Sequence, residues 1–324
     1  MITVLCGGVG GAKLVDGLAA VLPDPSALTV IVNTADDWDL WGLHICPDVD
    51  TVLYTLAGIA SPDRGWGVHG DTWAALDMLG RYRLPTWFRV GDRDLATHVA
   101  RTAWLRSGQR LTAVTRALGD ALGVAARVLP MCDEPVATIV ETPAGRMPFQ
   151  EYFVARGAAD RVDGIEFEGI EQARPSREVL DAVSAARLII VAPSNPLVSI
   201  GPILALRGMR DALARSRALR LAVTPLVAGR ALKGPTVEML EGLGMSADPA
   251  AVVRLYRDFL DVFILDTRDQ PAAAAVAAAG SSDRPLCVEC LDTIMADVAA
   301  RRRLAREVLG IAAARGAHVS PNGS

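Results

Sequence analysis

Five acidic residues lie close together near the start of the chain, shortly after the apolar run 28–33. They are Asp36, Asp37, Asp39, Asp48 and Asp50. Carboxylate oxygens are the hard ligands that Mg²⁺ prefers, especially beside the oxygens of a phosphate. We therefore predict that at least one of Asp36, Asp37, Asp48 and Asp50 binds Mg²⁺. Helix capping or simple exposure to water would also explain some of these aspartates, which leaves their individual roles open.

A glycine-rich turn directly follows the first apolar run, residues 2–6. It reads Gly7-Gly8-Val9-Gly10-Gly11, and Lys13 stands near the start of a helical pattern. A strand that turns through glycines into a helix N-terminus presents free backbone amides to an anion. We predict a phosphate site there, with Lys13 adding a point charge. The alternative is that the glycines serve only tight packing of the helix.

The glycine turn differs from two well-known motifs. A dinucleotide-binding motif has a third glycine where Lys13 stands, and a P-loop has a hydroxyl residue where Leu14 stands. Two other functions stay open for such a site, although the missing third glycine counts against the first of them. One is an NAD-dependent oxidoreductase, and the other is a non-catalytic nucleotide-binding regulatory module whose acids bind a metal.

Two further polar segments stand among apolar residues. Residues 87–98 include Arg89 and His98, which offer donors to a phosphate or a heteroaromatic edge, although surface ion pairs would also explain them. Ser194 and Asn195 follow the apolar run 188–192 and offer hydrogen bonds to a ligand.

Apolar runs alternate with helical patterns along most of the chain, which predicts an α/β fold with a doubly wound, Rossmann-like, mostly parallel sheet. The runs are 2–6, 28–33, 188–192, 219–224, 261–265 and 285–288, and the helical patterns are 12–21, 50–59, 177–186, 203–214, 235–241 and 249–259. Ligands of such folds bind beyond the carboxyl ends of the strands, so the glycine turn and the acidic loop should be neighbours.

Residues 65–163 interrupt this alternation. They contain helical patterns at 71–82, 95–107 and 111–122, then strand patterns at 137–141 and 147–154 joined by a Pro-Ala-Gly turn. A third strand pattern follows directly at 164–168. We predict a core of residues 1–64 and 164–324 with an inserted helical and β-hairpin subdomain, 65–163. The insertion would serve as a lid over the site or only as packing.

The composition excludes some classes of protein. The 324 residues carry a net charge of −4, without the basic excess that general nucleic-acid binding requires. The sequence shows neither a secretory signal pattern nor a long apolar run, so we expect a cytoplasmic protein without a membrane partner. Cys287 and Cys290 form a C-x-x-C motif without a second pair. The edge of a strand is a simpler interpretation of this motif than zinc binding.

Taken together, these segments resemble the 2-phospho-L-lactate transferase family of coenzyme F(420) biosynthesis, which includes a phosphoenolpyruvate transferase form. The resemblance covers about two thirds of the chain and is looser after Gly234. Ala35 replaces a glycine common in the family. The matching segments are GGVGGAK (7–13), NTADD (33–37), GLHICPDVDT (42–51), RGWG (64–67), WFRVGDRDLATH (87–98) and APSNPLVSIGPIL (192–204).

The resemblance implies a Mg²⁺-dependent transferase that joins a phospho-acid to Fo, 7,8-didemethyl-8-hydroxy-5-deazariboflavin. The donor would be a guanosine diphosphate that carries the acid, the terminal ribityl hydroxyl of Fo would attack, and GMP would leave. A homodimer follows from the resemblance alone. Whether the acid is lactate, enolpyruvate or glycerate is not marked by any motif.

The resemblance also suggests a role for each candidate residue. Asp36, Asp37 and Asp48 would hold Mg²⁺, and Asp50 would be the catalytic residue that orients or deprotonates the hydroxyl. Fo would contact Asp50, Arg89 and His98. The donor nucleotide and its phosphates would contact Gly7, Gly8, Gly10, Gly11, Lys13, Asn33, Ser194 and Asn195.

Overall fold

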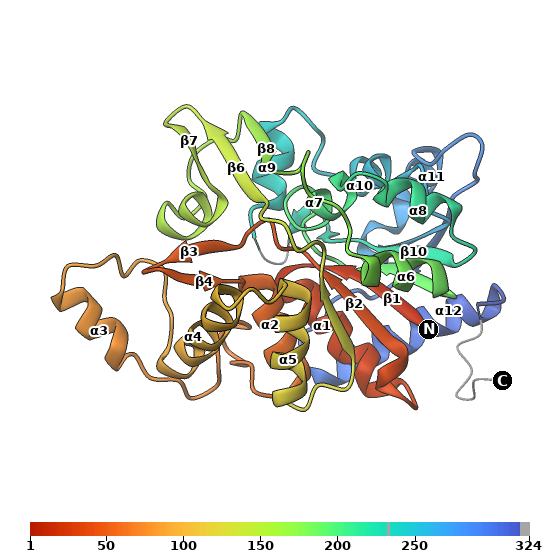
Figure 1. Ribbon diagram of the computed structural model, residues 1–324. Coiled ribbons are helices and arrows are strands. Elements are labelled where there is room, and N and C mark those ends of the chain that lie inside the picture. Colours follow the sequence, from red (N-terminus) through yellow and green to blue (C-terminus); the bar gives the residue numbers. More distant parts are fainter. Residues whose placement is uncertain (232–233, 318–324) are drawn as a thin grey trace.

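The computed structural model describes residues 1–231 and 234–317, and a seven-stranded parallel sheet forms its centre (Figure 1). The strand order is β14-β13-β10-β9-β1-β2-β5. In chain order this is the Rossmann arrangement 3-2-1-4-5-6 followed by a seventh strand, which confirms the predicted fold class. The strands are β1 (Ile2–Cys6), β2 (Leu28–Val32), β5 (Arg127–Pro130), β9 (Leu188–Val191), β10 (Leu219–Val223), β13 (Val262–Asp266) and β14 (Cys287–Leu291).

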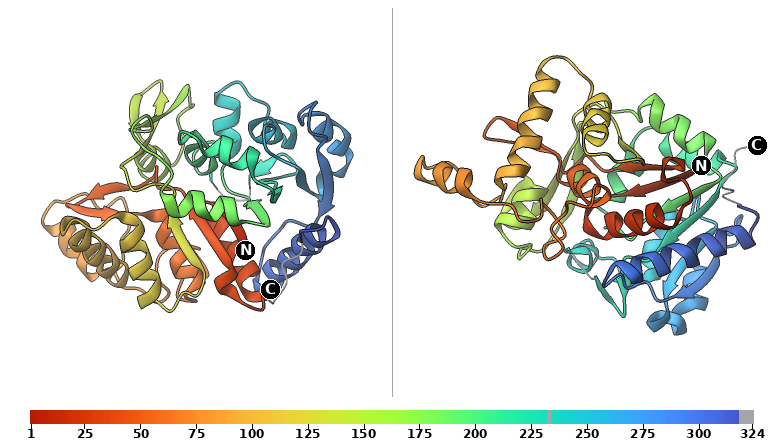
Figure 2. Two further views of the ribbon diagram at one scale, coloured as in Figure 1. Left: turned by 45° about the vertical axis from the view of Figure 1, so that its right-hand side comes forward. Right: turned by 90° about the horizontal axis from the view of Figure 1, so that it is seen from below.

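Helices cover both faces of this sheet (Figure 2). Successive side chains of a strand point to opposite faces, so Val4 of β1 packs in one core layer and Leu5 in the other. The first layer contains α1 (Gly8–Val21), α2 (Pro47–Leu56), α5 (Leu111–Ala121) and α12 (Val298–Ala314). The second contains α6 (Arg177–Ala185), α7 (Ile200–Ala205), α8 (Met209–Arg215), α10 (Pro249–Tyr256) and α11 (Ala273–Ala278).

Smaller elements surround the sheet. The strands β3 (Trp38–Leu40) and β4 (Leu43–Ile45) form an antiparallel hairpin, and a three-stranded sheet has the order β7-β6-β8. Its strands are β6 (Ala137–Thr142), β7 (Gly145–Pro148) and β8 (Gly164–Glu168). The remaining elements are α3 (Ala74–Arg81), α4 (Asp92–Arg106), α9 (Thr236–Gly242), β11 (Leu226–Val227), β12 (Arg230–Ala231), short 3-10 helices at Pro25–Ala27 and Thr267–Ala272, and a π-helix at Glu151–Ala155.

Two predicted elements differ from the structure, one by a break and one in kind. The single helix predicted over 203–214 is two helices, because Gly208 between them adopts φ of 88°. The strand predicted over 147–154 ends at Pro148 and is followed by the π-helix, which buries Tyr152 completely. The hairpin predicted around the Pro-Ala-Gly turn is confirmed, since β6 and β7 pair in antiparallel register.

The segment 65–163 is not wholly separate from the central sheet. Its strand β5 pairs in parallel with β2 and forms one edge of that sheet. The rest of the segment builds α3, α4, α5 and most of the three-stranded sheet, and α3 projects farthest from the body (Figure 1). The division into a core and an insertion therefore stays a prediction, and β5 belongs with the core in any such division.

Within residues 1–231 and 234–317, none of the helices combines the length and the hydropathy that crossing a bilayer requires.

Candidate functional site

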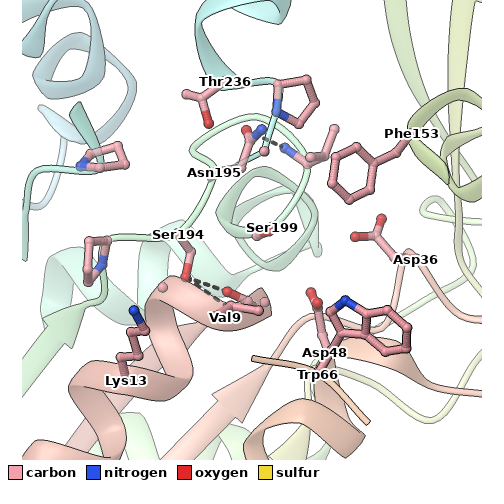
Figure 3. A pocket seen from close by; sticks show the side chains of 18 of the residues that line it. Val9, Lys13, Asp36, Asp48, Trp66, Phe153, Ser194, Asn195, Ser199 and Thr236 are labelled. Carbon is pink, nitrogen blue, oxygen red and sulfur yellow. Dashed lines mark hydrogen bonds between the residues drawn. The ribbon is translucent and has the colours of Figure 1, made fainter. Parts of the chain in front are cut away.

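A cavity of about 480 Å³ opens where the strand order reverses, at the carboxyl ends of β1 and β9 (Figure 3). The segments that follow five different strands line it, which is the usual place of a ligand in a doubly wound sheet. These lining residues include Gly7, Gly8 and Gly10 after β1, Asp36 after β2, Pro193, Ser194 and Asn195 after β9, Thr224 and Pro225 after β10, and Thr293 to Ala296 after β14.

The four glycines of the turn have different roles. Gly7 is the N-cap of α1, and Gly8, in the first turn, adopts φ of 62°, a left-handed conformation that favours glycine. Side chains at the next two glycines would collide with neighbours: a Cβ on Gly10 would lie 2.5 Å from the carbonyl oxygen of Pro193, and one on Gly11 would lie 2.6 Å from Cβ of Cys6. Close packing therefore explains Gly10 and Gly11, while Gly7, Gly8 and Gly10 also line the cavity.

Hydrogen bonds join the glycine turn to the loop after β9. The hydroxyl of Ser194 donates to the carbonyl oxygen of Gly7 at 2.7 Å and accepts from its amide at 3.1 Å. Nζ of Lys13 donates to the carbonyl oxygen of Met295 at 3.0 Å, so this side chain spans the edge of the cavity (Figure 3). The side-chain oxygen of Asn195 accepts from the amides two and three residues on, which fixes the shape of its loop.

Asp36 and Asp48 bring two carboxylates to one side of the cavity (Figure 3). Their residues are 5% and 8% exposed, and Oδ1 of Asp36 has no hydrogen-bond partner among the described residues. Burial raises the pKa of Asp36 well above its usual range, and the charge of Asp48 raises it further. Burial also raises the pKa of Asp48, to about 6. Two buried carboxylates with raised pKa values, one of them with a free oxygen, fit a divalent cation such as Mg²⁺.

Asn33 positions Asp48 without lining the cavity itself. Its amide nitrogen donates to Oδ2 of Asp48 at 3.0 Å and to the carbonyl oxygen of Val198 at 3.2 Å. Its side-chain oxygen accepts from the amide of Ala35 at 3.0 Å. Asn33 is fully buried, so it would hold Asp48 in position without contacting a ligand in the cavity itself.

Asp50 and His98 lie outside the cavity, in a buried polar cluster between α2 and α4. The guanidinium of Arg101, which is fully buried, donates to both carboxylate oxygens of Asp50 and lies 3.1 Å from Nδ1 of His98. His98 in turn lies 3.3 Å from Asp94, which accepts a hydrogen bond from the hydroxyl of Tyr54 at 2.8 Å. The structure thus gives Asp50 a positively charged partner that sequence reasoning missed.

The spacing of polar residues along α4 carries a signal for this cluster. Asp94, His98 and Arg101 follow one another at intervals of four and three residues, which places them on one face of a helix. All three are buried. Three polar residues on one face of a predicted helix would have indicated a cluster of charged side chains that requires a partner from another element.

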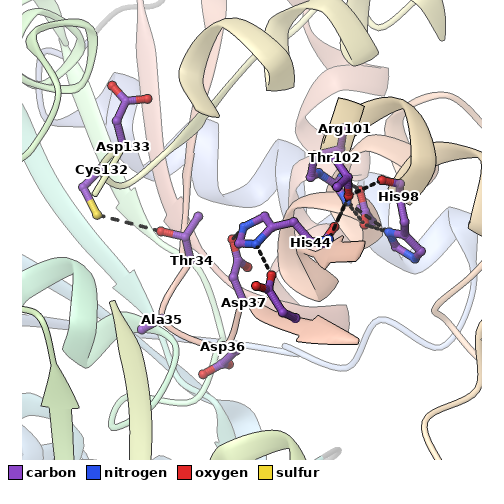
Figure 4. A network of polar contacts seen from close by, with 12 residues as sticks. Thr34, Ala35, Asp36, Asp37, His44, His98, Arg101, Thr102, Cys132 and Asp133 are labelled. Carbon is purple, nitrogen blue, oxygen red and sulfur yellow. Dashed lines mark hydrogen bonds and ion pairs between the residues drawn. The ribbon is translucent and has the colours of Figure 1, made fainter. Parts of the chain in front are cut away.

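Asp37 also lies outside the cavity, although it is adjacent to Asp36 in the chain. Its side chain is 6% exposed and faces His44 of the β3–β4 hairpin (Figure 4). The three predicted metal ligands are therefore divided: Asp36 and Asp48 share the cavity, and Asp37 stands beside a different group of side chains.

Arg89 is exposed and is connected to the cavity through a row of cation–π contacts. Its guanidinium lies 4.3 Å from the ring centre of Trp73, and that of Arg64 lies 5.1 Å from the same ring. Arg64 also lies 5.2 Å from the ring of Trp66, and both of these residues line the cavity. The result is an alternating row of guanidinium groups and indole rings that leads from the cavity to Arg89.

Several lining residues were not among the predicted site residues. Phe149, Gln150 and Phe153 come from the π-helix region, and Thr236 comes from the start of α9. The rings of Phe149 and Phe153 stack at 5.5 Å. Their spacing of four residues is typical of a helix, but nothing in the local sequence indicated that this turn would face the glycine turn.

The fold and the site define a class: Rossmann-like α/β proteins with a ligand-sized cavity at the topological switch point. Within that class the comparisons with known proteins are specific. Residues 2–304 match the family described as 2-phospho-L-lactate transferase CofD, so the chain belongs to this family of transferases. The resemblance stated from the motifs is thereby confirmed.

Two relatives illustrate the similarity. The chain is 39% identical to a phosphoenolpyruvate transferase of Kitasatospora aureofaciens over 317 residues, which cover 96% of this chain and 97% of that protein. It is 40% identical to a 2-phospho-L-lactate transferase of Methanospirillum hungatei over 310 residues, covering 95% and 99%. A solved structure of a UPF0052 family member from Bacillus halodurans matches with a TM-score of 0.58 at 16% identity, over 95% of this chain and 98% of that chain. This last likeness concerns the fold alone.

Proposed function

We propose that the protein transfers a phospho-acid from a guanosine-diphospho-linked donor to the terminal ribityl hydroxyl of Fo. A bond forms between that oxygen and the distal phosphorus, the bond to GMP breaks, and the products are GMP and coenzyme F(420)-0 or its dehydro form. The acid is 2-phospho-L-lactate or a phosphoenolpyruvate-type group, as in the names of the relatives. The observation that carries this proposal is one cavity that combines a glycine turn at a helix N-terminus with two buried carboxylates, in a chain of this family.

The donor would lie at the β1 and β9 end of the cavity. The helix N-terminus of α1 would favour the phosphates of the donor there, and Lys13 adds a positive charge at the same edge. Phosphoryl transfer depends mainly on positioning and on stabilising the negative charge of the oxygens, which are the two things this turn supplies. Ser194 would hold the turn in place from the opposite loop.

The acceptor would lie at the aromatic end. Phe149, Phe153 and Trp66 line that part of the cavity beside Arg64, and such groups stack on a flat heteroaromatic ring. In this placement the ribityl chain would extend toward the glycine turn. Arg89, which was predicted to contact Fo, would act at the outer end of the same stacked row.

Asp36 and Asp48 would hold Mg²⁺, which when bound neutralises charge on the phosphate oxygens. Asp50, predicted as the catalytic residue, does not line the cavity, and its carboxylate is paired with Arg101. Direct contact between Asp50 and the hydroxyl would require that pair to open. A role in which Asp50 and His98 hold α2, and with it Asp48, in position needs no such change.

The decisive experiment offers the purified protein Fo, Mg²⁺ and each guanylylated acid in turn: lactyl, enolpyruvyl and glyceryl. Mass spectrometry of the product and measurement of GMP release identify both the reaction and the acid. We expect one acid to give product, and chelation of the metal to abolish it. The Asp36→Asn variant should lose activity, whereas Asp120→Asn, on the exposed surface of α5, should keep it.

Other results would favour the alternatives. Binding of guanine nucleotide and Fo without product from any donor would support a regulatory module. Binding of NAD in place of both ligands would support an oxidoreductase and contradict the proposed transfer.

A further inference from the structure

We propose that the β3–β4 hairpin carries a second metal site, separate from the cavity, in which Asp37, His44 and Cys46 bind a transition-metal cation of the Zn²⁺ type. The carboxylate, imidazole and thiol atoms of these three residues all lie within 4.8 Å of one another. The proposal does not depend on the transferase function, and nothing in the proposed reaction uses these groups.

The hairpin geometry brings the side chains to one face. Asp39 and His44 are direct cross-strand partners in the antiparallel register. Asp37 lies two residues before Asp39 and Cys46 lies two residues after His44, so that each stands just outside the paired part of its strand. Because alternate residues of a strand point to the same face, Asp37, Asp39, His44 and Cys46 share one side of the hairpin.

The buried carboxylate of Asp37 is the main evidence for a bound cation. Its side chain is 6% exposed, and neither carboxylate oxygen has a hydrogen-bond partner among the residues that the structure describes. Nε2 of His44 lies 3.7 Å from Oδ2, too far for a hydrogen bond but suited to two ligands of one ion. Burying a carboxylate without a hydrogen bond is costly, and burial accordingly raises the pKa of Asp37, although the nearby His44 acts to lower it. A cation between these groups would remove that cost.

His44 is already oriented as a metal ligand (Figure 4). Its Nδ1 lies 3.0 Å from Oδ1 of Asp39, which leaves Nε2 directed toward Asp37. Metal-binding histidines usually donate their second ring nitrogen to a carboxylate in this way, which fixes the tautomer. The competing state is a protonated His44 between two carboxylates: burial alone would lower its pKa, but the charges of Asp37 and Asp39, together with the hydrogen bond to Asp39, outweigh burial and raise it.

The donor set selects the kind of metal. Cys46 is fully buried, and burial raises the pKa of its thiol, so it would be neutral without a metal but deprotonated by one. Sulfur, nitrogen and oxygen donors together suit Zn²⁺ or Co²⁺, whereas Mg²⁺ prefers oxygen ligands alone. The nearby charge of Arg101 is balanced by Asp50. The cavity site of Asp36 and Asp48 and the hairpin site would then take different metals.

The test is a Co²⁺ titration of the full-length protein after removal of bound metal by a chelator. We expect one bound Co²⁺ per chain with a thiolate-to-cobalt charge-transfer band in the near ultraviolet, displaced by Zn²⁺ and not by excess Mg²⁺. Cys46→Ala should abolish the band, and His44→Gln should weaken binding by more than about tenfold. Asp39→Asn should weaken it by about 10- to 100-fold, as expected for loss of a carboxylate behind a metal-binding histidine.

Matched controls are His69→Gln and Cys290→Ser, which alter a histidine and a cysteine away from the hairpin and should leave the band unchanged. Absence of the band from the wild-type protein would overturn the proposal. So would a band that survives in Cys46→Ala or disappears in Cys290→Ser. If Cys46→Ala fails to fold by circular dichroism, His44→Gln decides the question, because His44 is partly exposed and tolerates replacement.

Discussion

Asp48 makes stability depend on pH in a direction opposite to that of most carboxylates. Burial raises its pKa in the folded protein to about 6 from an ordinary value near 4. Its protonated form is therefore favoured by folding: the stabilisation is complete below about pH 4 and is lost as the pH rises through about 6. For Asp48→Asn, which cannot ionise, we expect the metal-free protein to lose less stability between pH 4 and pH 7.

Thermal melts of metal-free protein across that pH range measure this effect, which amounts to at most about 3 kcal/mol for a shift of two pKa units. Asp120→Asn, with a side chain 72% exposed, is the control and should melt with the wild-type profile. A profile for Asp48→Asn that matches the wild type would show that Asp48 is not destabilised by burial.

Asp50 allows a residue-scale test that separates catalysis from structure. Asp50→Asn would leave the guanidinium of Arg101 buried without its carboxylate, which costs about 3–5 kcal/mol for a buried pair. We therefore expect a marked loss in the free energy of unfolding, measured by chemical denaturation, with partial recovery in the double variant Asp50→Asn, Arg101→Met. Unchanged stability together with lost turnover would instead favour the predicted role of Asp50 as the catalytic residue.

Some of the site residues could be recognised from the sequence, but their contacts could not. The acidic cluster, the glycine turn and the polar pair after β9 were recognisable because each follows an apolar run. The sequence could not show that Asp36 enters the cavity while Asp37 faces His44, because this depends on the direction of each of two adjacent side chains. Asp50 was predicted to be catalytic because nothing near it in the sequence indicated its partner: Arg101 lies 51 residues further along the chain.

At the scale of elements, α1 and α12 pack so closely that one glycine between them cannot be replaced without strain. A Cβ on Gly17 would lie 2.3 Å from the carbonyl oxygen of Arg301, a backbone atom that cannot rotate away. Gly17→Ala should therefore destabilise the protein by about 1–3 kcal/mol. Chemical denaturation measures the change.

Gly310, on the exposed side of α12, provides the matched substitution. A Cβ there meets no atom within 4 Å, so Gly310→Ala should stabilise the protein by about 0.5–1 kcal/mol through helix propensity. Destabilisation by both variants to the same degree would mean that helix packing is not the cause.

Elements with long, uninterrupted patterns were predicted with nearly correct ends, and those that depend on distant partners were not. The strand β5 was missed because its four residues begin with Arg127 and end with Pro130, and only pairing with β2 makes them a strand. The break between α7 and α8 depends on the left-handed conformation of Gly208, within a pattern that is otherwise continuous.

At the scale of the whole molecule, the cavity joins residues from Gly7 to Ala296, so a ligand that fills it should stabilise the entire fold. In a thermal-shift series with Mg²⁺ we expect GDP, GMP and Fo to raise Tm, and NAD to leave it unchanged. At a ligand concentration of 100 times Kd the gain is about 2.7 kcal/mol. Stabilisation by NAD but not by guanine nucleotides or Fo would contradict the transferase proposal.

The paired hydrogen bonds between Gly7 and Ser194 also give the cavity a built-in reporter of its opening. The amide proton of Gly7 is buried and bonded to the hydroxyl of Ser194, so it can exchange with deuterium only when the glycine turn separates from the loop after β9. A ligand that bridges both loops would slow this exchange, and one that binds only at the aromatic end would not. The isotope content of one short N-terminal peptide would thus distinguish donor binding from acceptor binding without labelling either molecule.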